Sequence, residues 1–291
     1  MASMRLSPAL KAVINAPHAQ GGPVPAPAEG IVKSLFERLS GEKRVGEETW
    51  LTLGTAALVT LNSPATLCAL YSFAVGRAGQ AENDQKAVEC AAIMREAGLK
   101  TISFSGIPRA INNLGALRAH LDPSIAAQLP TAPTREPTPA SLSTISTSAH
   151  SLWTSIYAPH DEKLLSKLAL SHPDLPVHIL NSHYGPLLAD PPASTPFPPE
   201  GGAKVGRVLT SVVAVACLRA QGGVGPQVTS HIFGLRKAGE EKVEAGSEED
   251  LEGREWLTSE EGATWVVEQV DRIVEAVTGG KGPTHGMRAK L

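Results

Sequence analysis

Histidine is the side chain best suited to proton transfer near neutral pH, because its unperturbed pKa is about 6.5. Among the nine histidines of this chain, His231 has the most informative surroundings. It lies in the segment 207–239, where apolar residues recur at helical spacing, stop at 222–226 and then resume. The pattern predicts two helices joined by a short break, with Pro226 in the first turn of the second helix. On that helix Gln227 shares a face with His231, which could transfer one proton.

This order of helix, break and histidine-bearing helix resembles the active-site helix pair of the carboxymuconolactone decarboxylase and AhpD-like superfamily. In redox-active members the second helix opens with Gly-Cys-x-x-Cys and carries a histidine four residues later. Laid onto Gly223 to His231, the histidine matches, but Val224 and Gln227 occupy the two cysteine positions. The resemblance implies an all-α, AhpD-like fold with His231 as first candidate proton donor. It also implies cofactor-independent decarboxylation or isomerisation of a small organic acid or lactone.

Two further segments carry candidate residues for the same pocket. Residues 172–188 resemble the helix that lines the pocket in that superfamily, which makes His183 the second candidate proton donor and Tyr184 a candidate substrate-binding residue. The stretch Gly-Ile-Pro-Arg-Ala-Ile-Asn resembles the superfamily's Gly-x-Pro-x-x-x-Asn helix start. Its Arg109 and Asn112 could bind an acid group if their helix closes the site. Gln227 completes the set as a candidate hydrogen-bonding residue.

Two classes of function stay open on the sequence. In the first, the protein is a cofactor-independent enzyme that acts on a small-molecule acid. In the second, it is a catalytically silent relative that binds a ligand or partner, since a lone histidine among apolar helical residues is often a packed core residue. An enclosed cavity at His231 with a second polar group would favour the enzyme, and apolar filling of that space would favour the binder.

The sequence contains no motif that predicts redox, metal or nucleotide chemistry. Cys68, Cys90 and Cys217 form no C-x-x-C pair, and their apolar neighbours predict buried structural thiols. His178 and His183 are five residues apart, which places them on different faces of an α-helix, and no carboxylate joins them at metal-ligand spacing. No glycine-rich phosphate loop follows a strand. We therefore expect no metal and no cofactor.

The composition is that of a globular protein. Hydrophobic residues make up 42% of the 291 residues, while a net charge of −3 and 4% aromatic content give no reason to expect nucleic acid as a partner. The N-terminus shows no secretory signal. Residues 51–76 carry no charge, but Asn62, Ser63 and Pro64 interrupt them, so we predict a buried helical hairpin rather than a membrane span.

A diverged repeat organises the chain. Shifted by 160 positions, YSFAVGRAG at 71–79 overlays HIFGLRKAG at 231–239, with Tyr71 in the place of the histidine. This overlay predicts two tandem AhpD-like units packed as a pseudo-dimer, and it leaves a homodimer of the whole chain open. The expected divisions are a flexible arm, a first unit, a linker, a second unit and a mobile tail, at 1–29, 30–129, 130–148, 149–278 and 279–291.

The last three residues suggest where in the cell the protein is located. Ala289, Lys290 and Leu291 resemble the Ser-Lys-Leu peroxisomal targeting tripeptide, with a small residue, a cation and leucine in order. Gly279, Gly280, Gly282 and Pro283 break the preceding helix and would leave the tail accessible. We therefore expect a peroxisomal matrix protein whose partner is the targeting receptor.

Overall fold

The computed structural model describes residues 5–16, 23–77, 83–191, 197–241 and 251–282. Within these ranges it is all-helical, with 71% of residues in helices and no strand, which confirms the predicted all-α class. The helices of the first half are α1 (Pro8–Ile14), α3 (Glu29–Leu39), α4 (Glu47–Thr60), α5 (Pro64–Gly76), α6 (Asn83–Lys100), α7 (Ile102–Ser105), α8 (Ile107–His120) and α9 (Pro123–Ala126). Those of the second half are α10 (Leu142–Tyr157), α11 (Asp161–Ser171), α12 (Asp174–His178), the π-helix η1 (Ile179–Leu188), α13 (Arg207–Gln221), α14 (Gly225–Ala238), α15 (Arg254–Leu257) and α16 (Glu260–Thr278).

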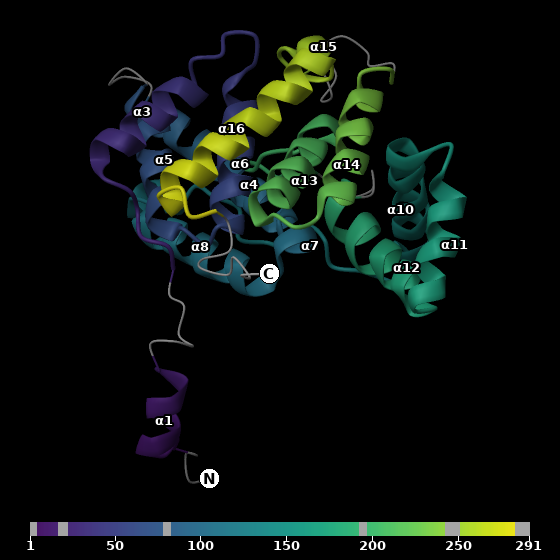
Figure 1. Cartoon of the computed structure of the whole chain (residues 1–291), viewed down its shortest axis with the longest axis horizontal. Helices are drawn as coiled ribbons and strands as arrows, with labels where there is room; N and C mark the ends of the chain where they lie inside the picture. The colour runs from purple at the N-terminus through teal and green to yellow at the C-terminus, as the bar shows by residue number, and fades with distance from the viewer. Residues whose placement is uncertain (1–4, 17–22, 78–82, 192–196, 242–250, 283–291) are drawn as a thin grey trace.

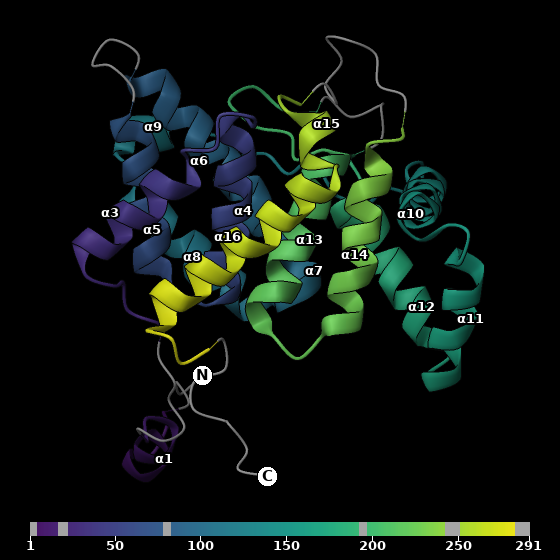
Figure 2. The same ribbon diagram turned by 45° about the horizontal axis from the view of Figure 1, so that its top comes forward.

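Helices α4 and α13 form the centre of the molecule and pack against each other (Figures 1 and 2). Nearly every residue of both is buried, as expected for helices that are apolar or small on all sides. Helix α16 lies across the pair, α5, α6 and α8 cover the α4 side, and α14 packs on α13. Both predicted hairpins are therefore present, and no described helix is long and apolar enough to cross a bilayer.

A second, smaller core joins α10, α11 and η1 beside α14. Its buried side chains include Trp153, Ile156, Leu180 and Tyr184. In Figure 2 this group, drawn in teal, lies on the far side of α14 from α4. Helix α14 therefore has one face against the central core and the other against the smaller core, and His231 belongs to this helix.

The turn between α13 and α14 follows the predicted break. Gly222 and Gly223 have φ angles of 70° and 74°, in the region that residues with a side chain rarely adopt. Pro226 stands in the first turn of α14, as predicted. These residues reverse the chain in a short distance and so fix α14 against α13.

The helices differ from the expectations at three places. The apolar pattern over 82–97 predicts a helix that ends at Gly98, but α6 continues to Lys100. A β-carbon at Gly98 would lie 2.8 Å from the Leu114 side chain, so this glycine permits close packing of α8 instead of ending the helix. Helix α10 begins at Leu142, inside the linker expected at 130–148. The helix expected over 174–188 changes at Ile179 into a π-helix that contains Gly185 and Pro186.

Part of the segment expected as a flexible arm is held in place. Val24 is buried, its backbone N–H donates to the Asn62 carbonyl at 2.8 Å, and its carbonyl accepts from the Ser63 hydroxyl at 2.9 Å. These bonds attach the stretch before α3 to the turn between α4 and α5.

Candidate functional site

His231 lies in a chain of three polar side chains at the contact of α14, α10 and η1. Its Nε2 is 3.1 Å from the hydroxyl of Tyr157, the last residue of α10. The Tyr157 hydroxyl is in turn 2.8 Å from the hydroxyl of Tyr184 in η1. Two of the three tyrosines in the protein therefore share one hydrogen-bonded chain with His231.

Two glycines allow the helices to approach closely enough for these contacts. A β-carbon at Gly185 would lie 2.6 Å from the Ile145 carbonyl oxygen of α10, and one at Gly234 would lie 2.7 Å from the Ile156 side chain. Either distance is shorter than side chains tolerate. The absence of a side chain at these positions lets both η1 and α14 pack closely against α10, which places both Tyr184 and His231 within reach of Tyr157.

Aromatic rings enclose the polar chain. The Phe104 ring of α7 meets the His231 ring edge to face, with centroids 5.5 Å apart. The Trp153 ring lies 4.2 Å from that of Tyr157 and 5.0 Å from that of Tyr184. This packing leaves His231 only 5% exposed.

Arg207 supports the site from the first turn of α13. Its guanidinium donates to the Ser155 hydroxyl at 2.8 Å, to the Ser211 hydroxyl at 2.6 Å and to the Gly234 carbonyl at 2.9 Å. It therefore joins α13, α10 and α14 around the histidine. Its positive charge also lowers the pKa of His231.

Burial and the Arg207 charge lower the pKa of His231 to about 4. The ring is therefore neutral at pH 7, and one of its nitrogens carries a proton. Burial also raises the pKa of Tyr157 above its ordinary value and that of Tyr184 well above 10, so both hydroxyls are neutral. The Nδ1 atom of His231 is buried and has no hydrogen-bond partner in the described part of the chain. A buried ring nitrogen without a partner is costly, and a ligand with a complementary group would remove that cost.

His183 lies in the same π-helix but faces a different neighbour. Its Nδ1 is 3.1 Å from the Ser103 hydroxyl of α7, and burial with the nearby His178 lowers its pKa. The prediction that His178 and His183 lie on different faces of a helix is wrong, because the centroids of their rings are 5.3 Å apart. The wider turns of η1 place residues five apart in one row, as the 2.8 Å bond from the Ala189 N–H to the Tyr184 carbonyl shows. Among the described residues no group of three or more metal-ligating side chains forms around them.

The remaining sequence-predicted residues lie outside this chain of contacts. Gln227 is exposed in the first turn of α14. Arg109 donates to the Thr60 carbonyl at 2.7 Å, and Asn112 donates to the Asn62 side chain at 3.1 Å. Arg109 and Asn112 therefore hold α8 against the end of α4 and the turn that follows it. The targeting residues Ala289, Lys290 and Leu291 lie outside the described residues.

The sequence analysis did not identify Tyr157, Arg207 or Phe104. Tyr157 stood at the end of a short apolar segment, and only the scarcity of tyrosine in the chain marked it. Arg207 opened the helix pair but matched no motif. Both contact residues of other helices that are 27 or more positions away in sequence. Residue spacing within one helix could therefore not reveal them.

Three clefts of the described surface lie away from His231. A cleft of about 750 Å³ lies over α6 and α8, and smaller ones lie beside Phe233 and beside Trp256. His231 lines none of these three. The aromatic rings described above occupy the space beside its imidazole.

The three cysteines are free thiols. Burial raises the pKa of Cys90 to about 12 and that of Cys217 to about 11, and it also raises the pKa of Cys68. The thiolate is the nucleophilic form, so these groups are poorly suited to redox exchange at neutral pH.

Comparisons with family models, with curated proteins and with solved structures found no match to this chain.

Proposed function

We propose that the protein is a cofactor-independent acid–base enzyme of the carboxymuconolactone decarboxylase type, acting at His231 on a small organic acid or lactone. One observation carries the proposal: a neutral, buried histidine whose Nε2 is held by the Tyr157–Tyr184 chain and whose buried Nδ1 has no partner among the described residues. Such a ring has a fixed orientation and one nitrogen left for a ligand.

An acidic substrate would supply the charge that the reaction needs. With a pKa of about 4, His231 carries no proton to give as an imidazolium at pH 7. A carboxylate placed beside Nδ1 stabilises the protonated ring and raises this pKa. When the bond to the carboxylate breaks, carbon dioxide leaves, the electron pair stays on the substrate as an enolate, and the Nδ1 proton is transferred to the substrate carbon.

The surrounding residues have separate roles in this scheme. Tyr157 holds Nε2 and thereby orients the ring, and Tyr184 holds the Tyr157 hydroxyl. Arg207 positions α10 and α14, and its charge adds to burial in keeping the His231 ring neutral. The Phe104 and Tyr157 rings lie against the His231 ring, so in this scheme a substrate contacts Nδ1 after these rings move apart.

The test is a screen of lactones and β-keto acids with purified protein, which follows carbon dioxide release and substrate loss. His231→Gln should lower turnover by about 10² to 10⁴, the usual range for one acid–base group. His150→Gln, an exposed position on α10, is the matched control and should leave turnover unchanged. Retained turnover in folded His231→Gln protein would contradict the proposal.

The second candidate is a catalytically silent AhpD-like protein that binds a ligand or partner. The edge contacts of Phe104 and Tyr157 with His231 favour it, because aromatic side chains occupy the space that a substrate would need. In that case no compound of the screen is turned over, and His231→Gln only lowers stability.

The finer architecture is also a proposal: two tandem AhpD-like units that pack as a pseudo-dimer. In its support, shifting α4 and α5 by 160 positions places them on α13 and α14, and the two shifted partners α4 and α13 pack together. Superposing one hairpin on the other in an experimental structure tests it. A relation far from a twofold axis would contradict it.

A peroxisomal address is proposed from the sequence alone. A targeting receptor would bind Ala289, Lys290 and Leu291 when they stand at a free C-terminus. A fluorescent protein fused to the N-terminus should enter peroxisomes, and deletion of Leu291 should leave it in the cytosol. A variant that lacks residues 284–286 but keeps the tripeptide is the control and should still be imported. Import of the Leu291 deletion would contradict the assignment.

A further inference from the structure

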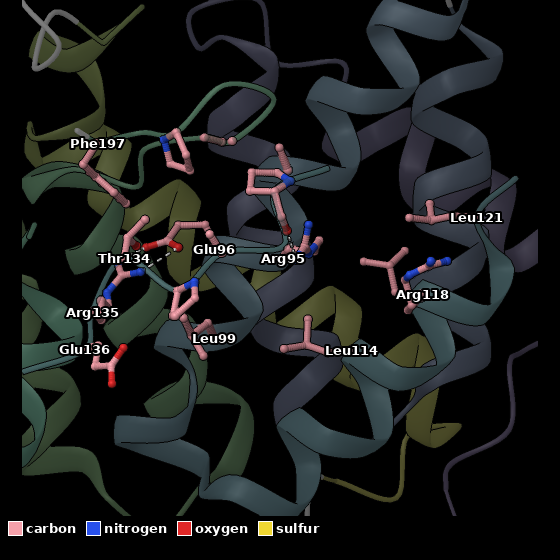
Figure 3. Close-up of a pocket in the computed structure, with 18 of the residues that line it drawn as sticks. Arg95, Glu96, Leu99, Leu114, Arg118, Leu121, Thr134, Arg135, Glu136 and Phe197 are labelled. Carbon is pink, nitrogen blue, oxygen red and sulfur yellow. Dashed lines mark hydrogen bonds and ion pairs between the residues drawn. The ribbon is translucent and has the colours of Figure 1, made fainter. Parts of the chain in front are cut away.

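The cleft over α6 and α8 has the size and lining of a ligand site (Figure 3). Its volume of about 750 Å³ falls within the range of small-molecule pockets. Apolar side chains of both helices form much of its lining, and residues 130–136 with Phe197 and Pro199 form the opposite wall. The apolar members from the helices are Ala92, Leu99, Leu114, Leu117 and Leu121.

Two arginines supply positive charge within this apolar lining. Arg95 projects from α6, is half-buried, and donates to the Pro130 carbonyl at 3.2 Å. Arg118 projects from α8, is exposed, and has no hydrogen-bond or ion-pair partner among the described residues. Both arginines line the same cleft, and burial together with the Arg118 charge lowers the pKa of Arg95. An anion held by both arginines would pair with two positive charges.

The other side of the cleft has its charges already paired. Glu96 accepts two hydrogen bonds from the Arg135 guanidinium, and the Phe197 ring lies 5.2 Å from that guanidinium. In Figure 3 Glu96 and Arg135 lie on one side of Arg95, and Arg118 lies on the other. Arg135 is already paired with Glu96, so we do not expect it to bind a further anion.

Glu136 adds a negative charge to the side of the cleft that holds Glu96 and Arg135. Glu136 is exposed and lines the cleft next to Arg135. A second acid group on a ligand would meet this carboxylate without a free cation to pair with. The cleft thus has one end that attracts an anion and one end that disfavours it.

We propose that this cleft binds an aliphatic monocarboxylate, with its carboxylate between Arg95 and Arg118 and its chain against Leu114 and Leu99. Guanidinium groups match carboxylates in geometry and form strong charge-assisted hydrogen bonds with them. The leucines bury the alkyl chain, and Glu136 discriminates against a second carboxylate. This site is separate from His231, so the inference does not depend on the proposed reaction.

Octanoate is the probe for a calorimetric titration of the full-length protein. Arg118→Gln should weaken octanoate binding at least 10-fold, and Arg95→Gln should do the same. Because Arg118 is exposed, its replacement should leave the thermal unfolding curve unchanged. Arg272→Gln, which removes a partly exposed arginine of α16 from a pair with Glu268, is the matched control and should bind octanoate as the wild type does.

Three related compounds test the chemistry of the site. 1-Octanol lacks the charge and octanedioate carries a second one, so each should bind at least 10-fold more weakly than octanoate. Inorganic phosphate, which lacks the chain, should show no measurable competition. Equal affinity of any of the three with octanoate, or an unchanged affinity in Arg118→Gln, would overturn the proposal. His231→Gln should bind octanoate normally, which separates this result from the fate of the proposed enzyme activity.

Discussion

The Tyr157 hydroxyl oxygen lies 3.1 Å from His231 Nε2 and joins the end of α10 to the middle of α14. Tyr157→Phe removes this oxygen and leaves both the histidine nitrogen and the Tyr184 hydroxyl without their partner. We expect the free energy of unfolding to fall by about 1–3 kcal/mol, the cost of an unsatisfied buried group. Chemical denaturation measures this decrease in the free energy of unfolding.

Tyr71→Phe is the control for this substitution. Tyr71 is buried in the central core, but its hydroxyl makes no hydrogen bond with the described residues. Its replacement should change the free energy of unfolding by less than about 0.5 kcal/mol. Equal effects of the two substitutions would mean that the hydroxyl chain contributes nothing.

The stability of the protein should depend on pH through His231. Its pKa is about 4 in the folded protein against an ordinary 6.5, so the unfolded chain binds more protons between these values. The free energy of unfolding therefore decreases as the pH falls from about 6.5 to about 4, by up to about 3 kcal/mol for 1.36 kcal/mol per pH unit. Above pH 6.5 this contribution is fully present.

The pH dependence is measured by denaturation at a series of pH values, with His231→Gln as the comparison. The variant lacks the titrating ring, so its curve should be flatter in this window by the amount stated. Parallel curves for the two proteins would show that His231 titrates near its ordinary value.

Arg207→Gln should both destabilise the protein and change His231. The substitution leaves the Ser155 hydroxyl and the Gly234 carbonyl without their charged donor, which we expect to cost roughly 2–4 kcal/mol. Loss of the positive charge should raise the pKa of His231, which NMR of the imidazole protons reports. Arg219→Gln breaks only an exposed pair with Asp271 and should cost less than about 1 kcal/mol without moving that pKa.

Gly185→Ala tests whether the approach of η1 to α10 forms the site. The added methyl group would lie 2.6 Å from the Ile145 carbonyl, so the helices must separate, at a cost of about 1–3 kcal/mol. Gly115→Ala in α8 meets nothing within 4 Å and should stabilise by about 0.5–1 kcal/mol through helix propensity. A neutral effect at Gly185 in denaturation experiments would refute the close contact.

The helical class and the two hairpins were predictable because their signals are local. The residues around Asn62 and Gly222 interrupt apolar helical stretches, and the structure turns at both. Gly98 misled the prediction because a glycine that ends a helix and a glycine that admits Leu114 look alike in sequence. Leu142 was missed because its serine- and threonine-rich surroundings resemble a linker, although α10 packs on η1 there.

The site was only partly predictable. A motif resemblance pointed to His231 and to Tyr184, and the structure connects these two through Tyr157. Arg109 and Asn112 were expected near them from a helix-start pattern, yet their hydrogen bonds are with Thr60 and Asn62. Contacts between helices depend on which faces meet, and that information is distributed over the whole chain rather than in one motif.

The π-helical geometry of η1 makes the site sensitive to chain length as well as to side chains. A π-turn spans one more residue than an α-turn, so removing one residue from Ile179–Leu188 would return the segment to α-helical spacing. Side chains beyond the deletion would rotate by roughly 100° about the helix axis. A deletion placed before Tyr184 would turn its hydroxyl away from Tyr157 while leaving the composition of the helix almost unchanged. A single-codon insertion or deletion here could therefore create or abolish the hydroxyl chain in one genetic step.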